Sequence, residues 1–258
     1  MESCVFISLL TTGNTFPDGY NAIIQLSESF FKVDNGNFTN IQQKIFNVEP
    51  DENILANVYT YADVSNCMEN QLQSQTALNI FYQVLNKAYT TNSFVIGWNI
   101  RELIDIINQN YKRLHGKDIE FKDQLKLIDI KKLTSLIYSL DVVGSYSLQA
   151  IYYYCYPEEY QTFRQDYYDN TCEETIKACL KFLKNDRLNT FRTLEYLYNY
   201  INEPHILDRM PFGKYKNYSF EYILQNDMNY LHWLIKQSNL AETDKDLHFT
   251  LNHLLSEH

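Results

Sequence analysis

The order of the secondary-structure signals is the feature that most constrains how this chain folds. Three β-rich runs come first, at Cys4–Leu9, Ala22–Val33 and Ile41–Phe46. They are followed by amphipathic helical patterns that alternate with short apolar strand signals, as at Ser93–Gly97 and Ile100–Leu114. A meander followed by alternating helices and strands builds one mixed sheet with helices packed against it. The sequence therefore predicts an α/β fold.

Further segments continue this alternation. We expect a short strand at Leu125–Ile130 and helices at Thr76–Ala88, Lys131–Leu140, Ser147–Tyr156, Thr175–Leu183 and Leu188–Ile201.

A change of pattern near Asn202–Pro204 predicts a boundary. Beyond it, Met210–Tyr218 is expected to supply short strands, and two helices are expected at Phe220–Leu224 and Met228–Gln237, with Trp233 in their core. We therefore predict a first domain at 1–186, a connecting helix or linker at 187–204, and a small α+β module at 205–258.

Composition excludes several classes of protein. The chain has 258 residues, enough for a substantial core, and its 22 Tyr and 15 Phe are unlike the composition of a disordered chain. A net charge of −10 argues against a protein that coats nucleic acid by electrostatics, because neutralising phosphates takes Lys and Arg. No apolar run reaches about 18 residues, and the first residues lack the pattern of a signal peptide. We therefore expect no membrane contact.

The cysteines predict a reducing compartment. There are five, which is an odd number, and they form no CxxC pair. Without a secretory signal this pattern favours reduced thiols in a cytoplasmic protein. The six His residues are scattered, whereas a zinc site needs clustered Cys and His.

Three strings stand where strands end or helices begin. The first is Ser8-Leu9-Leu10-Thr11-Thr12-Gly13, and the second is Ile96-Gly97-Trp98-Asn99-Ile100-Arg101-Glu102-Leu103. The third begins at Asn170 and continues into the apolar helix Thr175–Leu183. In this order and spacing they resemble the motifs of the DEDD-type 3′–5′ exonucleases, a family that includes the proofreading subunit of bacterial replicative polymerase and exodeoxyribonuclease X. The resemblance implies an RNase H-like mixed sheet flanked by helices.

In that family, acidic residues in these strings hold two divalent metal ions and a His acts as the general base. The resemblance places Ser8 and Leu10 at the acids of the first string, and Leu103 at the acid of the second. It places Asn170 and Thr175 at the His and Asp of the third. Ser and Thr are weak neutral ligands and Leu offers none, whereas two metals need about four carboxylates. The resemblance therefore implies the framework of an exonuclease without its catalytic residues.

A further string lies near the C-terminus. Met210-Pro211-Phe212-Gly213-Lys214-Tyr215-Lys216 resembles the M-P-F-G-K-[YH]-K-G motif, and Tyr230-Leu231-His232-Trp233-Leu234 resembles the later Y-L-x-W-L, of a small module fused behind exonuclease domains of the exodeoxyribonuclease X type. Asn217 stands where this module usually has Gly, a mild departure because Asn tolerates left-handed backbone angles.

Several of these residues have a simpler structural explanation. Asn170 and Thr175 are of the types that cap helices. Lys214, Tyr215 and Lys216 fit either phosphate contact with base stacking or a turn that defines the module's fold.

Charge and tyrosine runs also leave alternatives open. The segment Lys112–Lys132 holds seven Lys or Arg and four Asp or Glu, which fits a solvated surface or a basic patch. Glu158–Thr175 holds six acids and one Arg, and would repel a nucleic-acid backbone if it borders the ancestral cleft. Tyr152–Tyr154 with Tyr156 fits either a protein contact or core packing.

The predicted function is that of a catalytically inactive exonuclease homologue, a nucleic-acid-binding or scaffolding subunit of a nucleic-acid-processing assembly. Nucleic-acid contacts are assigned to Thr11, Thr12, Asn99, Lys214, Tyr215 and Lys216. The candidate partners are single-stranded DNA or RNA, a protein, and a second copy of the chain.

Two alternatives remain open. The first is an active 3′–5′ exonuclease with relocated acids, drawn from Asp18, Glu102, Asp105, Asp169, Glu173 and Glu174. Only this alternative needs a cofactor, Mg²⁺ or Mn²⁺. The second is a protein-interaction module with no nucleic-acid role.

Overall fold

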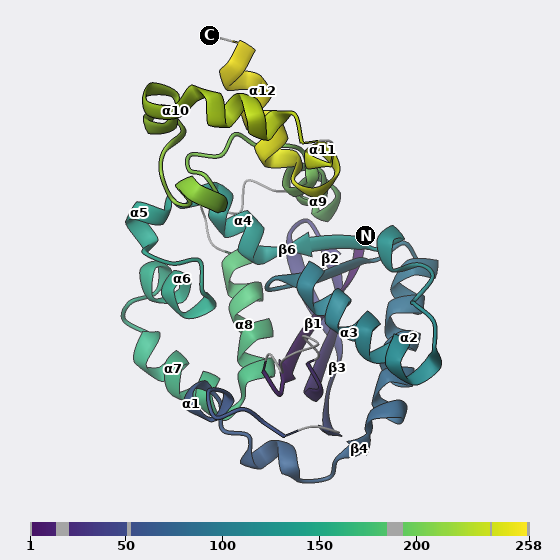
Figure 1. The fold of residues 1–258 in the computed structure, drawn as a ribbon. Coiled ribbons are helices and arrows are strands. Elements are labelled where there is room, and N and C mark those ends of the chain that lie inside the picture. Colours follow the sequence, from purple (N-terminus) through teal and green to yellow (C-terminus); the bar gives the residue numbers. More distant parts are fainter. Residues whose placement is uncertain (1, 14–20, 51–52, 185–192, 238, 257–258) are drawn as a thin grey trace. The chain divides into compact units, whose positions relative to one another are not determined.

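The computed structural model describes residues 2–13, 21–50, 53–184, 193–237 and 239–256. The chain divides into two compact units, Met1–Ile201 and Asn202–His258 (Figure 1). None of the helices in these ranges is both long and apolar enough to span a membrane.

The larger unit is built on a six-stranded mixed sheet in the order β4-β3-β2-β1-β5-β6. The strands are β1 (Glu2–Thr11), β2 (Ile23–Asp34), β3 (Asn37–Glu49), β4 (Leu72–Gln73), β5 (Phe94–Gly97) and β6 (Lys126–Asp129). The first three pair antiparallel, as the predicted meander requires, while β5 pairs parallel with both β1 and β6. The α/β fold with a mixed sheet is therefore confirmed.

The helices of the larger unit cover both faces of this sheet, with α2 and α3 on one side and α8 on the other (Figure 1). The helices are α1 (Val58–Tyr61), α2 (Ser74–Thr90), α3 (Ile100–His115), α4 (Ile130–Ile137), α5 (Leu140–Val143), α6 (Leu148–Cys155), α7 (Tyr160–Asp169), α8 (Thr171–Leu183) and α9 (Leu194–Asn202).

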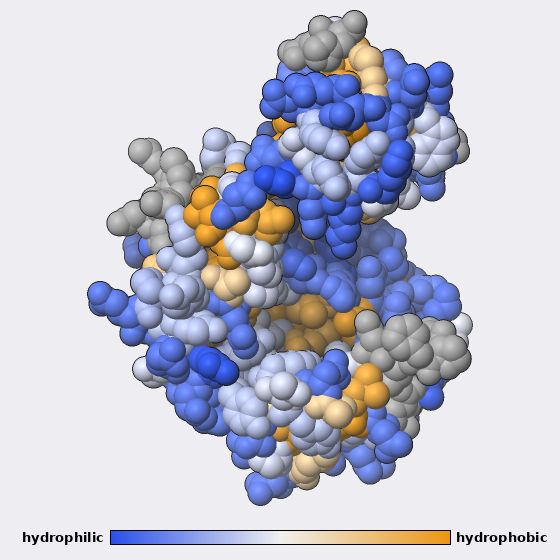
Figure 2. All heavy atoms as spheres, turned by 60° about the vertical axis from the view of Figure 1, so that its left-hand side comes forward, coloured by the Kyte–Doolittle hydropathy of each residue, from blue (hydrophilic) through white to orange (hydrophobic). Residues whose placement is uncertain are grey.

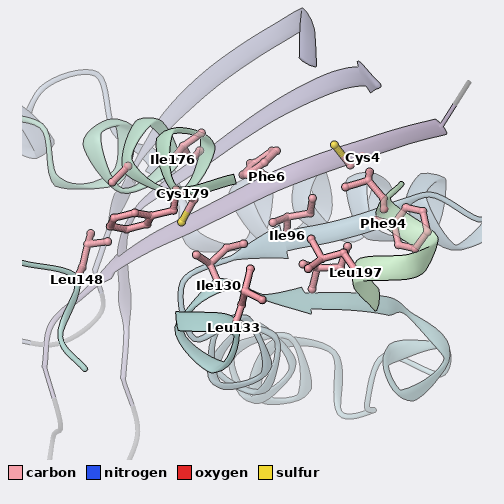
Figure 3. Packing of buried hydrophobic residues seen from close by; sticks show 14 of the residues in the cluster. Cys4, Phe6, Phe94, Ile96, Ile130, Leu133, Leu148, Ile176, Cys179 and Leu197 are labelled. Carbon is pink, nitrogen blue, oxygen red and sulfur yellow. The ribbon is translucent and has the colours of Figure 1, made fainter. Parts of the chain in front are cut away.

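Alternation along the central strand creates two separate cores. Cys4 and Phe6 of β1 point to the face covered by α8, while Val5 and Ile7 point to the face covered by α2 and α3. Figure 3 shows the first of these cores, in which side chains from β1, β5, α4, α8 and α9 meet. Because β1 is buried on both faces, its sequence is continuously apolar rather than alternating.

The ends of the larger unit are joined through the carboxylate of Glu2. Its two oxygens accept hydrogen bonds from the backbone N–H groups of Leu194 and Glu195, at 2.9 and 3.0 Å. These are orphan donors of the first turn of α9, and a carboxylate there also opposes the helix dipole favourably. Lys126 of β6 adds an ion pair with Glu195 at 2.9 Å. The first strand thus fixes the last helix of its own unit.

The smaller unit contains α10 (Phe220–Ile235), α11 (Leu240–Thr243) and α12 (Lys245–Ser256) around its own apolar cluster. Asp227 has non-helical angles (φ −157°, ψ 61°), so α10 consists of two helical pieces, as expected. The strands predicted within Met210–Tyr218 are wrong. The described chain instead has an isolated bridge between Arg209 and Ser219 and a 3-10 helix at Gly213–Tyr215. This turn is too tight to continue as paired β-strands, so its backbone N–H and carbonyl groups form hydrogen bonds within the turn itself.

Other sequence-based expectations need correction. The acidic segment before α8 was not predicted as regular structure, yet it forms α7, and α12 was also missed. The predicted helix Leu188–Ile201 falls partly on residues 188–192, which lie outside the described residues, and its described part is α9. Trp233 was expected in the core of the smaller unit, but it is 56% exposed.

The close approach of β5 to β1 predicts that Gly97→Ala destabilises the larger unit. A Cβ at Gly97 would lie 2.7 Å from the carbonyl oxygen of Ile7, a backbone atom that cannot rotate away. We expect a loss of about 1–3 kcal/mol in the free energy of unfolding, measured by chemical denaturation. Gly116→Ala is the matched control, because nothing lies within 4 Å of its Cβ and only its φ of +71° opposes the change. A smaller loss in Gly97→Ala than in the control would contradict the packing argument.

A buried carboxylate predicts a pH-dependent stability. Glu28 of β2 is 2% exposed and its Oε2 has no hydrogen-bond partner. Burial raises the pKa of Glu28 above its usual range, although Lys44 and Lys87 oppose the shift. The folded chain therefore holds the proton of the Glu28 carboxyl more tightly than the unfolded chain does. As the pH rises through the folded-state pKa, Glu28 lowers the free energy of unfolding. We expect Glu28→Gln to unfold at higher denaturant than the parent at pH 7.5 and at the same denaturant near pH 4. An equal gain at both pH values would contradict this account.

Candidate functional site

The C-terminal end of β1 carries Ser8 and Leu10, the first pair of positions that the sequence predicts to be degenerate. Ser8 and Leu10 are each 3% exposed and both point toward α8. Ser8 is hydrogen-bonded to the thiol of Cys172, and Leu10 packs in one apolar cluster with Cys172, Val58 and Val64. Burial raises the pKa of Cys172 strongly, so this thiol stays protonated. The side chains that contact Ser8 and Leu10 from α8 are therefore neutral.

The start of α3 carries the second string. Asn99 has left-handed backbone angles (φ 57°, ψ 42°), and its side-chain amide donates to Glu102. Leu103, at the position of the third acid, is half-buried and packs against the core on the α2 and α3 face. Leu103 thus packs against a different apolar cluster from the one that contains Leu10.

The start of α8 carries the third string. Asn170 lies at the N-cap position of α8, but its side chain makes no capping hydrogen bond. Thr175 lies inside α8, 7% exposed, and its hydroxyl donates to the carbonyl of Thr171 at 2.8 Å. The N-cap explanation is therefore wrong for Thr175. A hydrogen bond also links Thr175 to Tyr167, a phenol whose pKa burial raises far above its usual range.

These contacts test whether two divalent ions would fit. Ser8, Leu10 and Thr175 come together around Cys172 and Tyr167, and none of these five side chains is charged at neutral pH. Two metals would need carboxylates facing one another across this place. The residues present do not fit the family's two-metal centre.

The relocated acids do not assemble a substitute within the described residues. Glu102 accepts from Asn99, Asp105 lies 4.0 Å from Lys122, and Asp169 accepts from Gln165. Glu173 and Glu174 both pair with Lys177, at 2.9 and 2.6 Å. Across the described ranges no group of three His, Cys, Asp or Glu is placed to hold a metal ion. Asp18 lies outside the described residues.

Sequence reasoning missed Asp129, a buried acid beside this region. Its Oδ1 accepts from the backbone N–H groups of Asn99, Lys131 and Lys132, at 3.1, 2.9 and 3.3 Å. Burial raises the pKa of Asp129, while these three hydrogen bonds oppose the shift. The sequence signal was an Asp between a strand and a helix, a typical N-cap. Asp129 joins the starts of α3 and α4, so its role is to position the loop that carries Asn99.

The predicted nucleic-acid contacts of the larger unit differ in accessibility. Thr12 is fully buried, and its hydroxyl accepts from the backbone N–H of Ala22 at 3.1 Å. Thr11 and Asn99 are half-buried. Thr12 is thus engaged in holding the loop after β1, and nucleic-acid contact by Thr11 and Asn99 stays a prediction.

Ion pairs with neighbouring residues offset part of the charge in both charged stretches. In the basic stretch, Lys112 pairs with Asp118, Lys122 with Asp123, and Lys126 with Glu195, each at 2.9 Å. In the acidic stretch, Glu159 pairs with Lys181, whose ammonium also lies 4.2 Å from the ring centre of Tyr156. On the face that Figure 2 displays, hydrophilic residues predominate and apolar residues gather in separate patches.

Core packing is confirmed for part of the tyrosine run, whereas a protein contact by its exposed rings stays a prediction. Tyr152 is buried and stacks on Phe163, with ring centres 3.8 Å apart. Tyr153 is 57% exposed and Tyr154 is 37% exposed. The run therefore contributes one ring to the core and offers two to solvent.

The turn in the smaller unit is organised by Asp227. One oxygen of Asp227 accepts from Lys214 at 3.0 Å and from the hydroxyl of Tyr215 at 2.9 Å, while the other accepts from the backbone N–H of Tyr230. The hydrogen bonds from Lys214 and Tyr215 hold the pKa of Asp227 below its usual range. Gly213 has φ +76°, and a Cβ there would lie 2.7 Å from the Tyr230 hydroxyl. The string at 210–216 thus specifies a fixed turn, and its exposed cations are Lys214 and Lys216.

Comparisons with known structures define the class of fold. E. coli exonuclease I in complex with a dT13 oligonucleotide matches with a TM-score of 0.57 at 13% identity, over 78% of this chain and 43% of that chain. A zinc-bound complex of the same enzyme with single-stranded DNA gives 0.56 at 12%, over 78% and 42%. A complex of exonuclease I with the C-terminal peptide of SSB gives 0.52 at 11%, over 77% and 43%. The RNase H-like α/β fold that the sequence predicted is therefore confirmed, and it is similar to that of exonuclease I.

A second comparison concerns the C-terminal string. Residues 210–239 match the family described as exodeoxyribonuclease X-like C-terminal, which confirms the resemblance noted in the sequence. The chain spans less than half the length of the exonuclease I structures that it resembles. Comparison with curated proteins gave no match.

The closed end of β1 predicts that Ser8→Asp destabilises the protein at neutral pH. A carboxylate there would be buried next to Cys172 and Leu10, and the described residues in contact with this position offer it no cation. An uncompensated buried charge costs about 3–5 kcal/mol. Burial would raise the pKa of this carboxyl, so the loss should shrink as the pH falls toward its unfolded value of about 3.9.

Ser8→Asn is the matched control, since it has the same size without the charge and its loss should not depend on pH. Denaturant unfolding at pH 7.5 and pH 4, with and without Mn²⁺, makes the comparison. Stabilisation of Ser8→Asp by Mn²⁺ would contradict the inference that this position cannot hold a metal.

Proposed function

We propose that this chain is a catalytically inactive exonuclease homologue that binds nucleic acid in a nucleic-acid-processing assembly. The proposal rests on one observation at the end of β1, where the related fold is expected to hold metal-binding acids. There Ser8 is hydrogen-bonded to Cys172, and Leu10 packs in the same apolar cluster as Cys172. A fold that keeps its framework but packs apolar side chains where the metal ions would lie can still bind a ligand on its surface, but it cannot carry out metal-dependent hydrolysis at that place.

The fold comparisons support the nucleic-acid part of this proposal. Two of the similar structures are complexes of exonuclease I with single-stranded DNA. The match to an exodeoxyribonuclease X-like C-terminal family adds a second link to DNA-processing proteins. A cytoplasmic location is part of the same proposal. All five cysteines of the chain are free thiols, and free thiols are typical of proteins in a reducing compartment.

A protein partner is the second candidate function. The acidic stretch that includes α7, together with the exposed rings of Tyr153 and Tyr154, presents a surface poor in cations. Tyrosine is enriched where proteins contact one another, and such a surface would repel phosphate. The exonuclease I complex with the SSB peptide shows that a protein of this fold has bound a protein segment. The two candidates are compatible if nucleic acid binds elsewhere on the chain.

A binding titration combined with a gel assay tests the proposal. Labelled single- and double-stranded DNA and RNA are titrated with the full chain at low and moderate salt, with Mg²⁺ or Mn²⁺. We expect salt-sensitive binding without shortening of the strand. Lys216→Ala should weaken binding and lower the slope of log K against log salt by about 0.7, the contribution of one phosphate contact on a single strand.

Lys245→Ala is the matched control, since this lysine is also exposed in the smaller unit but lies outside the turn. Metal-dependent shortening that is abolished by a chelator and by Glu102→Gln or Asp105→Asn would overturn the proposal in favour of a relocated active site. Absence of binding to every nucleic acid would remove the nucleic-acid role and leave the protein partner as the candidate.

A further inference from the structure

Five aromatic rings form a continuous row on the smaller unit. In spatial order they are Tyr222, Tyr218, Tyr215, Tyr230 and Trp233, and we call this row the aromatic ribbon. Successive ring centres lie 5.1, 5.9, 5.2 and 5.7 Å apart. The residues come from the turn and from both pieces of α10, so the row exists only in the folded unit.

The two ends of the ribbon are open to solvent. Trp233 is 56% exposed, Tyr218 48% and Tyr222 44%, whereas Tyr215 and Tyr230 in the middle are half-buried. A helix that only needed to fill its own core would turn Trp233 inward, as it does Leu231 and Leu234. Large exposed rings gathered in one place mark a binding surface.

The ribbon is rigid because its middle is fixed by hydrogen bonds. Asp227 accepts from the Tyr215 hydroxyl and from the Tyr230 backbone N–H, and Gly213 allows the Tyr230 hydroxyl to lie against the turn. Rings held in place before a ligand arrives lose little conformational entropy on binding.

The charges beside the ribbon indicate the chemistry of its ligand. Lys214 is 65% exposed at its side chain and its ammonium lies 4.7 Å from the Tyr215 ring centre. Lys216 is exposed next to it. Asp227 forms an ion pair with Lys214, and Glu221, next to Tyr222 in the sequence, is exposed. The surface therefore suits a ligand with flat π-faces and a few negative charges, bound more by stacking than by charge.

We infer that the aromatic ribbon binds single-stranded nucleic acid, with bases stacked on Trp233, Tyr218 and Tyr222 and the backbone held near Lys214 and Lys216. This inference rests on the proposed function and assigns its binding site. Stacking requires exposed base faces, so a duplex is a poorer ligand than a single strand. The π-face is common to all bases, so the site has little sequence preference.

Fluorescence anisotropy with a labelled oligo(dT), an oligo(U), an abasic strand of the same length and a DNA duplex tests this inference on the full chain. Because base stacking on an aromatic ring is worth about 1–3 kcal/mol, Trp233→Ala should weaken oligo(dT) binding by about 5- to 150-fold. Trp233→Phe should restore part of the affinity. The abasic strand carries the same phosphates but loses stacking on all three rings, so it should bind the parent more weakly than oligo(dT) binds Trp233→Ala.

Phe249→Ala is the matched control, because Phe249 is 43% exposed in the same unit and lies outside the ribbon. It should change affinity less than twofold, and the thermal midpoint of each variant checks that it folds. Oligo(dT) bound without shortening and with equal affinity by the parent and Trp233→Ala would overturn the ribbon site and leave the proposed function standing. The ribbon site would also be overturned if the parent bound the abasic strand or the duplex as tightly as it binds oligo(dT). If the parent bound none of these strands, both the ribbon site and the proposed nucleic-acid role would be overturned.

Discussion

The packing of α8 across the end of β1 is the contact on which the larger unit depends. It buries Ser8 and Leu10 against Cys172 and places Thr175 beside Tyr167. An enzyme of this fold must keep that place open and charged, which costs stability through repulsion and desolvation among its carboxylates. Here the same backbone geometry is satisfied by neutral groups. Neutral side chains at this place and the close packing of α8 are therefore linked, because an acid under the packed helix would be a buried charge and a withdrawn helix would leave a cavity.

The smaller unit follows a different principle, in which one polar group arranges several rings. Asp227 interrupts α10, and the interruption lets its two oxygens reach both the turn and the second piece of the helix. The lysine and tyrosine of the C-terminal string are used mainly to hold this arrangement. The exposed rings of Tyr218 and Tyr222 lie outside both C-terminal strings, and that of Trp233 lies in the later one, at 230–234. A motif can thus be the support of a binding surface rather than the surface itself.

Much of the fold was predictable because periodicity reports burial. The meander, β5 with α3, and α8 all carry clear apolar patterns. The helix α7 was missed since its inward residues are mostly tyrosines among acids and glutamine, which a hydropathy pattern scores as polar. The resemblance drew attention to Ser8 and Leu10, but their burial and their contacts with Cys172 depend on residues more than 160 positions apart. Trp233 was misplaced for a related reason: helical spacing shows which residues share a face, and does not show whether that face is covered.

The link between Glu2 and α9 bears on how the chain folds as it leaves the ribosome. The carboxylate of Glu2 on the first strand cannot accept its hydrogen bonds until Leu194 and Glu195 have been synthesised, nearly 200 residues later. Until then Phe94 and its neighbours in the core lack the covering of Leu197. The sheet can pair early, since the meander is local in sequence, but the unit closes only when α9 is available. During synthesis an apolar face therefore stays uncovered for a long interval, which is the period when a chaperone would bind and when a truncated chain would aggregate.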